Sequence, residues 1–280
     1  MTLLRERKAN PVCPSGYHRP LCLLLLLVTL WAGAADAATL YDRSLGQLQQ
    51  RLPAFSPREF TFVVMGDSRG NDGVFKKALA LAATFQPLFI LHTGDFSDTG
   101  TRPEVEHFLS LVDGAVPGIP LFVVAGNHEN RQQFQALVGP LRYTLDLPRL
   151  DMRLVVEDNS SYALKGEQLG YLRRKLDGKQ RTTFVALHVP PRTERWSWHT
   201  FTEGAPELVV LLAERKVAMA FFGHIHQYDE DTVEGVRYVV TGGAGAPLVP
   251  FGFPGDPSHH IVVVQVREGK VTSRMVKIPR

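Results

Sequence analysis

The sequence has 280 residues, of which 44% are hydrophobic and 21% are charged, and its formal net charge is +3. That length allows one large domain or two small ones, and the apolar fraction is ample for a buried core. Residues 1–37 carry four basic and two acidic residues, so the rest of the chain has a net charge of +1. A near-neutral chain offers no electrostatic attraction for phosphate polymers, and we expect no nucleic-acid partner.

The first 37 residues have the pattern of a cleavable export signal. A basic segment precedes an apolar one at residues 21–31, and Ala35-Asp36-Ala37 supplies a small-x-small cleavage site, as does Ala32-Gly33-Ala34. The apolar segment is shorter than the ~20 residues that span a bilayer. We therefore predict a signal peptide over residues 1–37, a periplasmic or secreted protein and no stable membrane anchor, with an uncleaved anchor as the alternative. Both cysteines lie in this segment, so the mature chain is expected to form no disulfide.

After the signal peptide we expect an N-terminal extension, residues 38–58, with a helix at 40–52, and then one domain over residues 59–280. Five short apolar runs in that domain are typical of strands buried on both faces. These runs are residues 60–65, 88–92, 121–125, 183–187 and 218–222.

Two stretches with helical periodicity, residues 74–85 and 104–112, separate the first three predicted strands. The expected buried face of the first helix is Val74, Ala78, Leu81, Ala82 and Phe85. This alternation repeats about every 30 residues, the length of a strand-helix-strand unit, and therefore predicts parallel strands.

The second half of the domain predicts two more helices, at residues 164–176 and 208–215. It also predicts strands at 237–241, 260–267 and 271–278, the last two joined as a hairpin. We expect these late strands to form a second sheet packed on the first.

Each of the five apolar runs ends at a short polar cluster. The clusters are Gly66-Asp67-Ser68-Arg69, Gly94-Asp95-Phe96-Ser97-Asp98, Gly126-Asn127-His128-Glu129, Leu187-His188-Val189-Pro190 and Gly223-His224-Ile225-His226. Ligands of parallel sheets bind beyond the carboxyl ends of the strands, so the first three clusters should converge on one edge. A single Gly-Asp after a strand is most often a turn or a helix cap. Five such clusters in this order are a specific signal for a metal site with oxygen and imidazole ligands.

Two divalent metal ions close together can acidify a bridging water and screen the charge of a phosphoester. Asp95, on the central strand of the three, is the candidate for the ligand that both ions share. Asp67 and His226 would complete one metal site. Asn127, His188 and His224 would complete the other. This mixture of ligands suits Mn, Fe, Zn or Ni, so the sequence predicts two metals without naming them.

His128 follows a predicted ligand but need not bind metal itself. Beside a bound phosphate it could donate a proton to the leaving alkoxide or stabilise charge as imidazolium. Asp98 is expected to hold the other ring nitrogen of His128. The alternative for Asp98 is a cap on the helix that begins near Pro103.

The order Gly-Asp, Gly-Asp-x-x-Asp, Gly-Asn-His-Glu, His and Gly-His-x-His resembles the calcineurin-like metallophosphoesterases over residues 59–280. Residues 239–247, Val-Val-Thr-Gly-Gly-Ala-Gly-Ala-Pro, look like the glycine-rich turn that often follows the last motif in secreted bacterial members. The resemblance implies an α/β fold of four layers, a two-sheet β-sandwich flanked by helices. It also implies hydrolysis of a small phosphomonoester or phosphodiester by a hydroxide that bridges the metals, with His128 as the catalytic imidazole.

The chain departs from this family at Arg69, where most members have the histidine of an Asp-x-His motif. A guanidinium stays protonated and has no lone pair, so Arg69 cannot bind metal. Three consequences are open: fewer protein ligands with more water, a weakly held first metal, or Arg69 as a phosphate clamp. We favour a retained but weaker first metal with Arg69 facing the substrate. Purple acid phosphatases have a tyrosine in the second motif, and Phe96 disfavours that subgroup.

Two further features concern packing and substrate. His92, within a predicted strand, is expected to be a core histidine and not a ligand. The segment 192–205 contains Trp196 and Trp198, which either stack a base or lipid group of the substrate or cover the sheet edge. The function predicted is an exported metal-dependent phosphoesterase. The alternative is a catalytically silent metal- or phosphate-binding protein on the same scaffold.

Overall fold

The computed structural model describes residues 38–179, 182–249, 252 and 254–279, and the predicted signal peptide lies outside them. The described chain begins with helix α1, Leu40–Arg51, which is capped by Thr39. Leu40 and Leu48 are buried, and the Ser44 hydroxyl bonds the backbone N–H and C=O of Leu121 on the outermost strand of a sheet. The helix therefore covers a sheet edge that would otherwise expose unpaired backbone groups. Among the described residues, no helix is long and apolar enough to cross a membrane.

The first sheet has five strands in the order β11-β10-β1-β2-β3. Its strands are β1 Glu59–Met65, β2 Ile90–His92, β3 Leu121–Val123, β10 His260–Arg267 and β11 Lys270–Lys277. β1, β2 and β3 are parallel, as their spacing predicts. The prediction that the final hairpin belongs to a second sheet is wrong, because β10 pairs antiparallel with β1 through register pairs such as Phe62 with Val264.

The second sheet has six strands in the order β4-β5-β6-β7-β9-β8. Its strands are β4 Tyr143–Leu147, β5 Met152–Val156, β6 Thr182–Ala186, β7 Met219–Phe222, β9 Val236–Thr241 and β8 Tyr228–Val233. Strands β4, β5 and β8 are absent from the sequence-based prediction. The neighbours β5, β6, β7 and β9 run parallel to one another.

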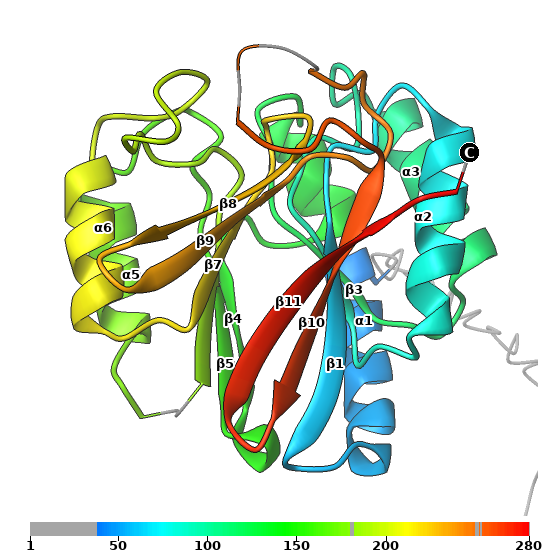
Figure 1. Ribbon diagram of the computed structural model, residues 1–280. Helices are drawn as coiled ribbons and strands as arrows, with labels where there is room; N and C mark the ends of the chain where they lie inside the picture. The colour runs from blue at the N-terminus through cyan, green and yellow to red at the C-terminus, as the bar shows by residue number, and fades with distance from the viewer. Residues whose placement is uncertain (1–37, 180–181, 250–251, 253, 280) are drawn as a thin grey trace, which may run out of the picture. The chain divides into compact units, whose positions relative to one another are not determined.

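The helices flank the two sheets and complete four layers (Figure 1). Alternate residues of a strand face opposite sides, so Phe62 of β1 enters the core between the sheets while Val63 packs under the helices of the first sheet. Those helices are α2 Asp72–Thr84 and α3 Arg102–Ala115; α5 Gly166–Lys175 and α6 Ala205–Glu214 cover the second sheet. The short elements are η1 Leu52–Ala54, α4 Arg131–Gln133, η2 Phe134–Val138 and η3 Pro148–Leu150. The four-layer α/β/β/α fold implied by the family resemblance is confirmed.

The buried face of α2 differs from the predicted one. Its buried side chains are Phe75, Ala78, Leu79 and Ala82. Val74, Leu81 and Phe85 are only partly buried. The physical reason is Phe75, whose ring stacks on Phe108 of α3 at 5.6 Å and meets the ring of His92 edge-on. An aromatic anchor of this size sets the rotation of the helix.

Phe62 joins the two sheets, and its truncation should be costly. Its fully buried ring stacks on Phe89 at 4.9 Å and meets Phe184 and Phe221 of the second sheet edge-on. We expect Phe62→Ala to lower the free energy of unfolding by about 3–5 kcal/mol, because a ring-sized cavity forms between two rigid sheets. Urea denaturation measures the change. Val210→Ala, on the exposed side of α6, is the control and should stay within about 0.5 kcal/mol of wild type. A similar midpoint for both variants would contradict the importance of this ring cluster.

Candidate metal centre

The six predicted metal ligands come together at the carboxyl ends of strands from both sheets. Asp67, Asp95 and Asn127 follow β1, β2 and β3, while His188 follows β6 and the two remaining histidines follow β7. Two groups form, and they share one carboxylate: Asp95 with His188 and His224, and Asp95 with Asp67 and His226. The ligand atoms of each group lie within 4.8 Å of one another.

Asn127, the sixth residue, belongs with the first of these groups. Its Oδ1 lies 3.0 Å from Nε2 of His188, and the same Nε2 lies 3.2 Å from Oδ1 of Asp95. In the other group, Nε2 of His226 is 3.4 Å from Oδ1 of Asp67. The group around His188 therefore has four protein donors, and the group around Asp67 has three.

Hydrogen bonds to the far side of each imidazole fix which nitrogen faces the centre. Nδ1 of His188 donates to the carbonyl of Thr93 at 2.7 Å, and Nδ1 of His226 donates to the carbonyl of Pro247 at 2.8 Å. Nε2 of each ring is thereby directed at the carboxylates, as in metal sites whose ligand histidines are oriented by a backbone carbonyl. For His224 the outer nitrogen is Nε2, 3.2 Å from the hydroxyl of Tyr162, so Nδ1 is the ring atom available to a metal.

The burial and charge of the site fit a pair of divalent cations. Asp67 and Asp95 are almost completely buried, and buried carboxylates require compensating positive charge. Burial opposes ionisation of Asp95, but the adjacent His188 holds the pKa of that carboxyl well below its usual value. Burial likewise opposes protonation of His188, yet Asp95 raises the pKa of this imidazole to about 10. A protonated His188 and a bound cation are therefore alternative sources of positive charge beside Asp95.

The backbone around the ligands is locally strained. Asp67, Asp95 and His224 have φ values of 55°, 58° and 69°, a left-handed conformation that costs energy for residues other than glycine. Gly94 has a φ of 102°, and a Cβ atom there would lie 2.7 Å from Nδ1 of His188. Only glycine lets this loop approach the histidine so closely. Such strain collects where a fold must aim functional side chains.

Glu129 joins two of the ligand loops, a role that the sequence did not reveal. Its buried carboxylate accepts the backbone N–H of Asp95 and Gly126 on one oxygen. The other oxygen accepts the backbone N–H of Phe96 and both the N–H and hydroxyl of Ser97. Five donors on one side chain hold the loops after β2 and β3 in fixed relation.

Asn159 holds the His188 loop in the same way. Its Oδ1 accepts the N–H groups of His188 and Val189 at 3.0 and 3.1 Å, and its Nδ2 donates to the carbonyl of Val189 at 2.7 Å. The sequence feature that could have identified Asn159 is the one used for the other clusters, a polar segment directly after an apolar strand. Asn159 follows β5, an apolar run whose polar ending has the sequence Glu-Asp-Asn.

His128 lies beside the candidate metal centre. Asp98 holds its ring, as predicted, but with the backbone carbonyl and not with the carboxylate. Nε2 of His128 is 3.9 Å from Oδ2 of Asp95, and Nδ1 donates to the main-chain carbonyl of Asp98 at 2.8 Å. The Asp98 carboxylate instead accepts from the guanidinium of Arg69 at 2.9 Å. Helix α3 begins after Thr101, whose N–H donates to Glu104, so the capping role considered for Asp98 is not found.

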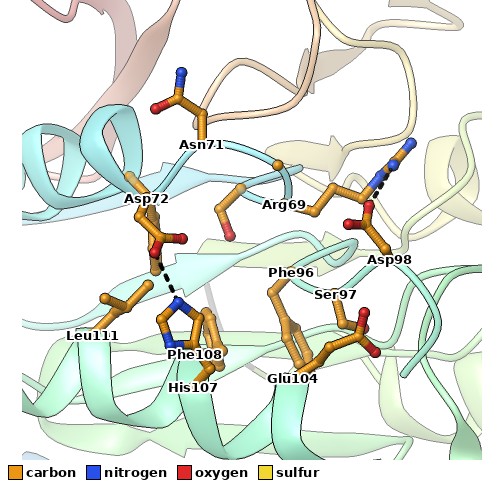
Figure 2. Close-up of a pocket in the computed structure, with 13 residues that line it drawn as sticks. Arg69, Asn71, Asp72, Phe96, Ser97, Asp98, Glu104, His107, Phe108 and Leu111 are labelled. Carbon is orange, nitrogen blue, oxygen red and sulfur yellow. Dashed lines mark hydrogen bonds and ion pairs between the residues drawn. The ribbon is translucent and has the colours of Figure 1, made fainter. Parts of the chain in front are cut away.

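Arg69 lines a cavity of about 490 Å³ between the loops and helices α2 and α3. Burial opposes protonation of the candidate ligand His226, Asp67 raises the pKa of that imidazole overall, and the guanidinium of Arg69 is near enough to oppose this rise. Figure 2 shows the Arg69–Asp98 ion pair at one end of this cavity. A second pair, Asp72 with His107 at 2.8 Å, lies at the other end. The residue that replaces the family histidine is therefore coupled to the residue that orients His128.

The structure tests the predictions for His92, Trp196 and Trp198. His92 is fully buried, its pKa is lowered to about 3 by burial, and its ring accepts from the N–H of Gly94 and bonds the Ser68 hydroxyl, so its core role is confirmed. Trp196 is also fully buried and donates to Asp229. Trp198 is 43% exposed. Only one of the two tryptophans remains a candidate for substrate contact.

Comparison with known proteins identifies the family. The family model for calcineurin-like phosphoesterases matches residues 60–228, and the chain belongs to this family. Among curated proteins it is similar to a probable cyclic nucleotide phosphodiesterase of Synechococcus, with 24% identity over 151 residues. That alignment covers 50% of this chain and 58% of the relative, so the chain matches little more than half the length of this protein.

Solved structures share the fold at low sequence identity. The purple acid phosphatase PPD1 from yellow lupin (Lupinus luteus) is 15% identical with a TM-score of 0.65, over 80% of this chain and 52% of the lupin chain. GAP50, described as the anchor in the inner membrane complex of Plasmodium, is 11% identical with a TM-score of 0.65, over 80% and 86%. A dimetal phosphatase from Danio rerio is 14% identical with a TM-score of 0.57, over 79% and 99%.

The protonation of His188 makes metal binding dependent on pH. Because its pKa is raised to about 10, the ring is protonated at neutral pH, and a metal must displace the proton on Nε2. We expect about one proton to be released from His188 when the group around it takes up its metal near pH 7, and the affinity of that group to rise as pH rises toward 10. Calorimetric titration with Mn²⁺ in two buffers of different ionisation enthalpy counts the protons. His188→Gln should reduce the count by about one, and an unchanged count would contradict this protonation state.

Proposed function

We propose that this protein is an exported, metal-dependent phosphoesterase that hydrolyses small phosphomonoesters or phosphodiesters. The observation that carries the proposal is the pair of ligand groups that share Asp95, with His128 placed beside the shared carboxylate. When bound, two divalent cations would acidify the attacking water and screen the charge of the phosphate. The donor set suits Mn, Fe, Zn or Ni. Export rests on the sequence of residues 1–37.

His128 is positioned to act as a proton donor. Its Nδ1–H is engaged by the carbonyl of Asp98, so Nε2 carries a proton only when the ring is imidazolium. In that form His128 gives the Nε2 proton to the leaving oxygen as the phosphorus–oxygen bond breaks. Asp98 keeps the ring in this orientation through its main chain. Arg69, paired with the Asp98 carboxylate, adds positive charge on the side where a phosphoester would enter.

A second candidate is a catalytically silent protein that binds metal or phosphate on the same scaffold. Arg69, in the position of a metal-binding histidine, favours it, and the anchor protein GAP50 has the same fold. The first candidate is preferred because the chain keeps every other candidate ligand of the family pattern, and His128 as well. A decayed site should have lost more than one of these residues.

Turnover of chromogenic substrates distinguishes the two candidates. Residues 38–280 would be assayed with p-nitrophenyl phosphate and bis-p-nitrophenyl phosphate. Each ester would be tested with the protein as purified, after removal of metal by a chelator, and after Mn²⁺ is added back. Metal-dependent hydrolysis of either ester supports the phosphoesterase. Absence of hydrolysis with Mn, Fe, Zn and Ni would overturn it in favour of the silent binding protein.

Removal of the imidazole of His128 should impair catalysis without emptying the metal sites. We expect His128→Ala to lower kcat about 10²- to 10⁴-fold, the usual worth of a general acid, while metal content stays near wild type. Elemental analysis and steady-state kinetics measure both. His107→Ala, which breaks only the Asp72 pair, is the matched histidine control. Equal loss of metal and activity would mean that His128 is a ligand.

Arg69→His tests whether position 69 still faces the first metal site. The group around Asp67 has three protein donors, and a fourth imidazole should strengthen binding there. We expect more metal retained per chain after dialysis than in wild type, read by elemental analysis. Arg69→Ala removes the guanidinium without adding a ligand and separates the two effects. If Arg69→His and Arg69→Ala retain equal metal, position 69 does not face that site.

A further inference from the structure

Four aromatic rings form a continuous row beside the metal centre. The ring of Tyr162 meets His224 edge-on at 5.1 Å between centroids, His224 lies 5.7 Å from His199, and His199 lies 4.5 Å from Trp198. The four come from three loops, those after β5, β6 and β7. We call these four residues the ring row. One of them, His224, is a candidate metal ligand, so the row begins where a bound phosphate would lie.

The ring row contains exposed side chains and a strained backbone. Neither feature is expected of residues whose role is only to pack in the core. Tyr162 and Trp198 are 42% and 43% exposed, and they are two of the three large hydrophobic side chains exposed among the described residues. Tyr162, His199 and His224 have φ values of 61°, 50° and 69°. Exposed aromatics on loops that are held in a costly backbone conformation are characteristic of binding sites.

Hydrogen bonds fix the two ends of the row. The Tyr162 hydroxyl lies 3.2 Å from Nε2 of His224, which anchors the tyrosine to the centre. The indole N–H of Trp198 donates to the carbonyl of Gly252 at 3.0 Å, which anchors the tryptophan by its edge. Rings held by their polar atoms present apolar surface at little entropic cost.

We infer that the ring row stacks a planar aromatic or heteroaromatic group of the substrate while the phosphate lies at the metal centre. This inference rests on the proposed phosphoesterase function and names its substrate class. The shared chemistry is a flat π-system esterified to phosphate, whether in an aryl alcohol or in a nucleoside. The ring row then selects by stacking, and hydrophobic burial alone would not discriminate in the same way.

Two matched pairs of phosphomonoesters test the inference. Benzyl phosphate and cyclohexylmethyl phosphate both release a primary alkoxide, and they differ in having a flat or a saturated ring. Stacking predicts about fivefold higher kcat/KM for the benzyl ester. Burial alone predicts the reverse, because the saturated ring is the more hydrophobic. Adenosine 5′-monophosphate against ribose 5-phosphate asks only whether a nucleobase contributes to recognition. A preference in the benzyl pair tests stacking itself, and comparison of the two pairs identifies the source of the ring.

Substitutions in the ring row show which residues cause the preference for the benzyl ester. Trp198→Leu and Tyr162→Leu keep apolar bulk and remove a ring, and each should reduce the preference to about twofold or less. Tyr162→Phe keeps the ring and removes only the hydroxyl, so the preference should remain. Equal loss in Tyr162→Phe and Tyr162→Leu would assign the effect to His224, and that result would contradict stacking.

A binding measurement separates failure of this inference from failure of the proposed function. Calorimetry with the non-hydrolysable 2-phenylethylphosphonate and 2-cyclohexylethylphosphonate, on the Mn²⁺-loaded protein, needs no turnover. Tighter binding of the phenyl compound without hydrolysis of any ester supports the ring row and overturns the phosphoesterase. Hydrolysis of both members of each pair at equal kcat/KM, with equal binding of the phosphonates, overturns the ring row and leaves the phosphoesterase intact.

Discussion

The buried carboxylate of Asp95 is the interaction on which the rest of the site depends. It lies at the end of the central parallel strand, and it is the one residue common to both ligand groups. A negative charge at this depth requires positive charge around it, which the histidines supply when protonated and divalent cations can supply instead. Glu129 and Gly94 fix the position of this carboxylate, because one holds the Asp95 loop by its backbone and the other lets that loop approach His188.

The convergence of the candidate ligands could be predicted from the sequence because it depends on a local rule. An apolar strand ends, a polar cluster follows, and parallel strands bring their ends together. What the sequence could not provide was the partition of strands between sheets. The pairing of β10 with β1 joins residues about 200 positions apart, and no local pattern encodes such a register. The sequence therefore predicts the wrong sheet for the final hairpin, although it places both strands to within one residue.

The residues that the sequence missed act by holding other residues in place, two through backbone groups and one through a side chain. Glu129 and Asn159 contribute hydrogen bonds to loop N–H groups, and their residue types are compatible with many other roles. Tyr162 contacts His224 across 62 positions of sequence. Position within a strand-end cluster identifies candidate ligands, but the orientation of an imidazole depends on a carbonyl or hydroxyl that only the folded chain brings near.

Arg69 shows how a lost ligand changes a site without dismantling it. A histidine at this position would be neutral and would bind the first metal, whereas the guanidinium is permanently charged and is drawn to the carboxylate of Asp98. That pairing places the charge of Arg69 on the same residue, Asp98, whose carbonyl orients His128. The exchange therefore concerns the candidate group around Asp67, which has three protein donors, Asp67, Asp95 and His226. The candidate group around His188, with Asp95, Asn127 and His224, does not include position 69, so the two candidate groups differ in their number of protein donors.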